Sequence, residues 1–109
     1  MKPIIHENHT LFTEARLHVN DDIFIADRMI IDTCTPYTKL SLKKGREMGL
    51  TEGMNEMTIH SFSVGPLKVS GFTVQFEDLE ADGIIGLDFL KKTGAKINLD
   101  AMTISSSRT

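Results

Sequence analysis

Polar and apolar side chains alternate along the first third of the chain. Every second residue from Ala15 to Val19 is apolar, and a second β-rich run covers residues 23–31. A period of two is typical of a strand with one buried face. The cluster Asn20-Asp21-Asp22 between the runs favours a tight turn, so this region predicts a β-hairpin. Residues two apart point the same way, and this predicts one shared face for Ile23, Ile25, Met29 and Ile31.

The same order of elements then recurs. Residues 57–64 and 67–76 are β-rich runs around Gly65-Pro66, which predicts a second hairpin. A short apolar strand follows at Ile84-Ile85. A last hairpin is predicted from residues 95–99 and 102–104, and the polar tail at residues 105–109 is expected to fray.

Two short helices punctuate this pattern. Ser41 is placed to cap a helix over residues 42–48, and a second helix is predicted over residues 86–93. Gly49 and Gly94 follow them, at the position where a left-handed C-cap favours glycine. Hairpin, apolar strand and helix therefore occur twice, which predicts a mostly-β fold with an approximate internal two-fold.

Composition limits the classes of function. The 109 residues fit one domain, 1–109, and 40% of them are hydrophobic, enough for a small core. The net charge of −3 is spread along the chain, which argues against a nucleic-acid-binding groove. No apolar run approaches the length of a membrane span. The single cysteine excludes an intrachain disulfide and favours a reducing compartment, so we expect a cytoplasmic protein.

Two segments resemble the motifs of the retropepsin-like aspartic proteases. The first is residues 29–35, Met-Ile-Ile-Asp-Thr-Cys-Thr, with a helix ending in Met48-Gly49-Leu50. It is similar to the family's apolar residues, then Asp-Thr/Ser-Gly-Ala/Ser, and later Leu-Gly-Leu. The second, residues 81–90, is similar to the family's apolar-apolar-Gly motif and the helix after it. Over residues 11–104 the resemblance implies a closed β-barrel of the acid-protease fold with one or two short helices.

The resemblance also implies an activity. This family hydrolyses peptide bonds with two aspartates that share one proton and activate a water molecule. Asp32 would supply one of them, so an active enzyme would be a homodimer acting on a peptide or protein substrate, without a cofactor or metal. Thr33 would hold the two paired loops together, and Thr35 would meet the substrate. The loop would be supported from beneath by Ile84, Ile85 and Gly86.

Cys34 departs from the family, whose active-site triplet ends in glycine. That glycine lies in a crowded loop where its amide reaches the carboxylates, and a positive φ there would strain a cysteine. We expect Cys34 to be a small, buried apolar side chain in the substrate-binding loop. A redox-sensitive thiol near the dimer axis and a cysteine nucleophile remain alternatives. Loss of catalysis is another, and it would leave a dimerising or peptide-binding module.

Two further family features are implied less directly by the sequence. A glycine-rich hairpin, the flap, covers the family's cleft, and its counterpart would be residues 51–57, with Gly53 and Met54 contacting substrate. The other glycines typical of a flap are missing there. The chain termini often build the family's dimer sheet, a role that would fall to residues 3–5 and 102–104.

The remaining polar residues have simpler interpretations. His6 and His9 have a spacing that chelates metals on a helix, but neither a helix nor further ligands are predicted, so we interpret them as surface residues. Asp82 is expected in a turn. Asp88 is expected in the first turn of the second helix, where the helix dipole favours an acid.

Overall fold

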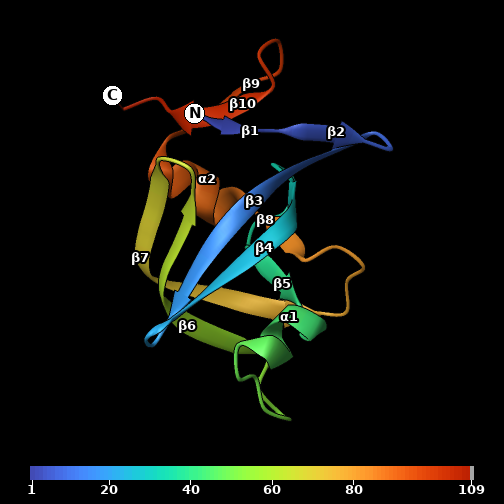
Figure 1. The fold of residues 1–109 in the computed structure, drawn as a ribbon, viewed down its shortest axis with the longest axis vertical. Helices are drawn as coiled ribbons and strands as arrows, with labels where there is room; N and C mark the ends of the chain where they lie inside the picture. The colour runs from blue at the N-terminus through green and yellow to red at the C-terminus, as the bar shows by residue number, and fades with distance from the viewer. Residues whose placement is uncertain (109) are drawn as a thin grey trace.

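A closed β-barrel forms the body of the molecule in the computed structural model, which describes residues 1–108 (Figure 1). Its six strands run in the order β3-β4-β8-β5-β7-β6, and β6 pairs back onto β3. Their bounds are β3 Thr10–Val19, β4 Asp22–Ile31, β8 Gly83–Ile85, β5 Lys39–Ser41, β7 Leu67–Glu77 and β6 Glu56–Val64. A short strand, β2 (Ile5–Glu7), extends the sheet beyond β3. The expected mostly-β barrel is confirmed.

The strand pairing is unchanged when the two halves of the barrel are exchanged. β3, β4 and β5 correspond in order to β6, β7 and β8, and a short helix follows each triplet: α1 (Leu42–Glu47) and α2 (Leu87–Thr93). Under this exchange the parallel pair β4–β8 becomes β7–β5, which is also parallel. The β3–β6 and β5–β8 pairs map onto themselves. The predicted internal two-fold is therefore present in the topology.

Both predicted barrel hairpins form, but the predicted face of β4 was wrong at its start. Met29 is fully buried, whereas Ile23 is 57% and Ile25 37% exposed. Thr13 opposes Met29 while Ala15 opposes Ala26, so β4 has one residue more than β3 between these pairs. This β-bulge reverses which side chains face the core.

The bulge is held by the strand's other neighbour. Asp82 lies in a bend, as predicted, and its Oδ2 accepts a hydrogen bond from the Arg28 amide at 3.1 Å. Its own amide donates to the Arg28 carbonyl at 3.0 Å. Beyond the bulge, β4 runs parallel to β8 in register, with Met29 opposite Gly83 and Ile31 opposite Ile85. The bulge therefore determines which side chains at the end of β4 face the core.

Both helices begin and end close to the predicted residues. The Ser41 hydroxyl accepts from the Lys44 amide at 3.0 Å and caps α1. Gly94 adopts the left-handed conformation, φ +64°, at the end of α2. Phe89 of α2 packs on Phe62 of β6 and Phe72 of β7, with ring centroids 4.9 and 5.8 Å apart. This aromatic cluster fixes α2 against β6 and β7 of the barrel.

A second, three-stranded sheet lies at one end of the molecule. Its order is β1 (Lys2–Pro3), β10 (Thr103–Ser106) and β9 (Ala95–Asn98), so both termini meet there (Figure 1). The terminal segments that were expected to build a dimer sheet thus pair with each other within one chain. β10 includes Ser105 and Ser106 of the predicted tail, and residue 109 lies outside the described residues. In residues 1–108, no helix has the length and apolar character needed to cross a membrane.

Candidate active site

Asp32 follows directly from the buried parallel pair of β4 and β8. Its amide donates to the Ile85 carbonyl at 3.1 Å, which continues the β4–β8 ladder by one residue. The chain then turns, and the Thr35 amide approaches the Asp32 carbonyl at 3.4 Å. Rigid barrel strands therefore position the aspartate at the start of a surface loop.

Both oxygens of the Asp32 carboxylate accept a hydrogen bond from this loop. Oδ1 accepts from the Cys34 amide at 2.8 Å, and Oδ2 accepts from the Thr35 hydroxyl at 2.7 Å. The Thr35 hydroxyl and then the Cys34 amide hold the pKa of Asp32 below its ordinary value of 3.8, against the opposing effect of burial. The carboxylate of a single chain is therefore oriented and ionised at neutral pH.

The start of α2 supports the loop from the other side. The Leu87 amide donates to the Thr35 carbonyl at 2.8 Å, and the Asp88 amide donates to the Pro36 carbonyl at 3.1 Å. At Gly86 a Cβ would lie 2.7 Å from the Thr35 carbonyl oxygen, so only glycine allows the loop this close. Of the three residues to which the resemblance gave a supporting role, Ile85 and Gly86 contact the loop, whereas Ile84 pairs with Ile30 of β4 and Lys39 of β5.

Sequence reasoning missed the strongest anchor of the loop. Thr38 is fully buried, and its hydroxyl donates to Asp88 Oδ1 at 2.7 Å while accepting from the Gly86 amide at 3.1 Å. The Thr38 amide also points at both Asp88 oxygens, at 3.0 and 3.1 Å. Asp88 does lie in the first turn of α2, as predicted. Its partner is far away in sequence, and no local pattern marks it.

Cys34 is exposed, so its expected burial was wrong. Its backbone is not in the left-handed region, and the strain feared for a cysteine does not arise. The amide that reaches Asp32 belongs to the backbone, so any L-residue with this conformation supplies it. Thr33 beside it is exposed as well. The Thr35 hydroxyl donates to Asp32, and the contact of Thr35 with substrate stays a prediction.

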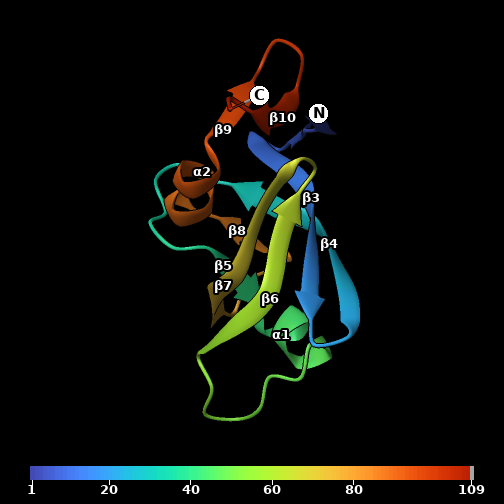
Figure 2. The ribbon, with the colours of Figure 1, turned by 90° about the vertical axis from the view of Figure 1, so that its left-hand side faces the viewer.

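The segment expected to be a flap contains a turn rather than a hairpin. The Met54 amide donates to the Thr51 carbonyl at 3.1 Å, and Gly53 has φ +89°. This loop joins α1 to β6 and projects from the end of the barrel opposite the β1-β10-β9 sheet (Figure 2). Gly53 and Met54 are exposed there, and no hydrogen bond joins them to the Asp32 loop within residues 1–108.

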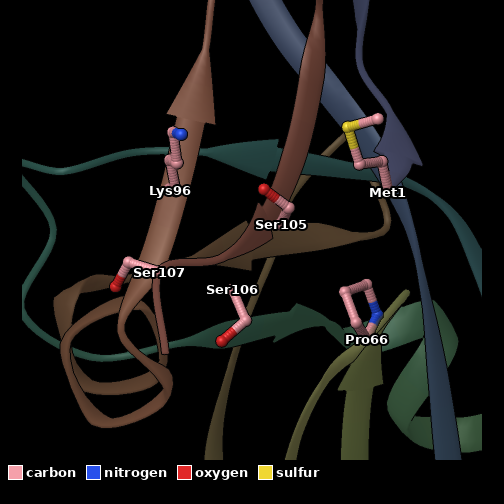
Figure 3. A pocket seen from close by; sticks show the side chains of 6 residues that line it. All are labelled: Met1, Pro66, Lys96, Ser105, Ser106 and Ser107. Atoms are coloured by element: carbon pink, nitrogen blue, oxygen red, sulfur yellow. The ribbon is translucent and has the colours of Figure 1, made fainter. Parts of the chain in front are cut away.

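Two hollows open on the surface, and one of them lies beside the Asp32 loop. One of about 670 Å³ is polar and lies against the terminal strands, where Lys96 of β9 and Ser105 of β10 line it (Figure 3). Another of about 500 Å³ adjoins the Asp32 loop and is lined by Pro36, Tyr37, Leu87, Asp88, Lys91 and Lys92. Tyr37 is 57% and Leu87 41% exposed, which gives this hollow an apolar rim. Within residues 1–108, no group of three or more His, Cys, Asp or Glu residues is arranged to hold a metal.

Solved structures with the same fold support the resemblance. The chain aligns with a retropepsin-like aspartic protease from Rickettsia conorii at a TM-score of 0.65 and 17% identity, over 90% of this chain and 85% of that one. It aligns with the retroviral protease-like domain of Ddi1 from Leishmania major at 0.65 and 15% identity, over 90% of each chain. No protein-family model and no curated sequence matches it. The chain has the retropepsin-like aspartic protease fold, as expected.

Proposed function

We propose that the chain is one half of a homodimeric aspartic endopeptidase and that Asp32 is its catalytic residue. The observation that carries this proposal is the Asp32 carboxylate, partly exposed at the end of β4 and held through both oxygens by its own loop. Each chain supplies one such carboxylate. The chemistry needs two, so the site is complete only when two copies meet at this loop.

In the dimer, the two Asp32 carboxyl groups share one proton. Two carboxylates a few ångströms apart resist ionising together, so the pair titrates as a unit, with one pKa raised by the other charge. The ionised member takes a proton from water, and the oxygen of that water bonds to the scissile carbonyl carbon. The protonated member gives its proton to the carbonyl oxygen. The C–N bond then breaks as the leaving nitrogen takes up a proton.

The surface around the loop supports this arrangement. Thr33 and Cys34 are exposed beside Asp32 in the single chain, where a second copy would approach. The apolar side chains of Tyr37 and Leu87 lie exposed at the adjoining hollow. An extended peptide or a second subunit would bury this rim and gain from it. Cys34 is no obstacle, because only its backbone amide is needed.

Cleavage of an unbiased peptide mixture between about pH 4 and 7, where coupled carboxylate pairs work, tests the proposal. Wild type should cleave, Asp32→Asn should not, and Cys34→Gly should stay within a few-fold of wild type. Asp32→Asn is a matched control because asparagine keeps the shape of the side chain while removing its charge and one of the two acceptor oxygens. Dimer formation is measured in parallel by sedimentation velocity, so that silence is interpreted only where the dimer is present.

One observation favours a second candidate, a catalytically inactive module that dimerises or binds peptides. The segment that we expect to correspond to the family's covering hairpin forms only a short turn at residues 51–54, and no hairpin lies between α1 and β6 in residues 1–108. If all three proteins form dimers and none cleaves, this second function is the correct one. Activity gained only in Cys34→Gly would mark a protease disabled at that residue.

A further inference from the structure

Two histidines from distant parts of the chain meet on the barrel wall. His18 lies on β3 and His60 on β6, and their ring centroids are 4.5 Å apart with the planes at 65°. His60 is exposed and His18 is half-buried, so water reaches the pair. Neither residue belongs to the Asp32 loop or to the hollow beside it.

A change of face in the β6–β7 hairpin brings them together. Ile59 and Ser61 are buried on either side of His60, and Phe62 and Val64 are buried after them, so the alternation of a flat strand breaks between Ser61 and Phe62. β7 breaks its alternation opposite this point, where Gly71 has φ +59°. β3 pairs with β6 only as far as this bend, and its last register pair is His18 with Ser61.

The separation of the rings suits one shared metal ion. A histidine nitrogen binds zinc at about 2.0–2.1 Å, which puts each ring centroid about 3.2 Å from the ion. Two rings that bind at a right angle or a tetrahedral angle then have centroids about 4.5–5.2 Å apart. The observed 4.5 Å brings the two side chains within reach of one ion. The rings meet edge to face in this structure, so binding an ion requires the exposed His60 ring to turn a nitrogen toward it.

We propose that His18 and His60 form a two-imidazole site for a borderline transition metal of the Zn²⁺, Ni²⁺ or Cu²⁺ type. Such ions prefer neutral imidazole, whereas Mg²⁺ and Ca²⁺ need carboxylate and carbonyl oxygens. A hollow of about 440 Å³ opens beside His60, with His18 outside its lining, so water ligands would reach the ion from the His60 side. It is lined by Val19, Asn20, Thr58, Ile59, His60, Ser70 and Gly71, with no acidic side chain in that set.

A bound ion would link β3 to β6, the pair of strands that forms the seam where the barrel closes. β3 and β6 share three register pairs, and the two histidines lie at the end of that seam. Because the unfolded chain does not hold them together, the ion binds the folded state and stabilises it by mass action.

The chain contains its own control. His6 and His9 lie close in sequence, but their rings are 6.4 Å apart, across a turn in which Asn8 and His9 have left-handed φ values. That separation exceeds the range of about 4.5–5.2 Å for two adjacent ligands of one ion. Removing these two histidines should therefore leave the proposed site intact.

Calorimetric titration of the untagged full chain with Ni²⁺ at pH 7.5 tests the site, with thermal melting as a second readout. We expect one ion per chain, a melting temperature that rises with Ni²⁺, and affinity at least tenfold weaker in His60→Ala and in His18→Gln. The double variant His6→Ala/His9→Ala should bind like wild type. Unchanged affinity in His60→Ala, or loss of binding in the double variant, overturns the proposal.

Paramagnetic broadening by substoichiometric Cu²⁺ places the ion directly and detects binding at the exposed thiol. Amide resonances of residues around His18 and His60 should broaden first. Broadening centred on Cys34, or on the turn at His9, would assign the metal elsewhere and refute the site. This measurement needs no variant to fold.

Discussion

Replacing Thr38 with valine removes a single hydroxyl from the hydrogen bonds that join the Asp32 loop to α2. The hydroxyl donates to the Asp88 carboxylate at 2.7 Å and accepts from the buried Gly86 amide at 3.1 Å. Valine has nearly the same shape, so the change creates no cavity. A hydrogen bond to a charged group contributes about 1.5–3 kcal/mol, and a buried amide without an acceptor costs roughly 1–3 kcal/mol. The two effects share one atom and do not add fully, so we expect a loss of about 2–4 kcal/mol in unfolding free energy.

The matched control applies the same substitution to a different threonine. Thr103 of β10 has a buried hydroxyl oxygen without a hydrogen-bond partner in the described residues. Thr103→Val removes a buried polar atom that makes no bond, so it should leave stability unchanged or raise it by about 1 kcal/mol. The same substitution should therefore lower the free energy of unfolding at Thr38 and leave it unchanged or raise it at Thr103.

Urea unfolding at neutral pH measures both variants at one fixed protein concentration, because dimerisation would otherwise shift the midpoint. The m-value should stay constant while the midpoint falls for Thr38→Val. By thermal melting the same loss should lower the midpoint by about 10 °C or more. The hydrogen bonds of Thr38 would not have the stabilising role assigned to them if Thr38→Val unfolded within about 0.5 kcal/mol of wild type. The same would follow if Thr103→Val were equally destabilised.

Two further changes test the site and the first helix. Thr35→Val removes the largest influence that lowers the pKa of Asp32, so NMR titration of the Asp32 carboxyl should show a higher pKa, and an unchanged value would contradict the geometry. The pKa of Asp32 is lower in the folded state than in the unfolded state. Asp32 therefore stabilises the fold at pH values above its unfolded-state pKa, and this contribution is lost as the pH falls through its folded-state pKa. The difference in unfolding free energy between wild type and Thr35→Val should accordingly shrink in acid. Ser41→Ala removes the α1 cap and should cost about 1 kcal/mol in urea unfolding, whereas no loss would show that tertiary packing alone holds the helix.

The sequence by itself determined the parts of this protein that depend on neighbouring residues. Alternation of side chains located the hairpins, Ser41 marked the start of α1, and Gly94 the end of α2. The motif around Asp32 placed the aspartate at the end of a strand because the strand and the turn after it are both local features. The order of these elements was enough to predict a mostly-β fold with an internal two-fold, and the resemblance of the two motifs implied the closed barrel.

Tertiary structure decided what depends on residues far apart in the chain. The β4 bulge, which exposes Ile23, appears only when β4 is registered against β3, since a strand pattern read alone has a fixed period. The link from Thr38 to Asp88 and the contact of His18 with His60 each join the two halves of the barrel. The exposure of Cys34 depends on how the whole loop packs against α2. Such contacts form only when the barrel closes, and a local sequence pattern does not indicate which distant residue will be the partner.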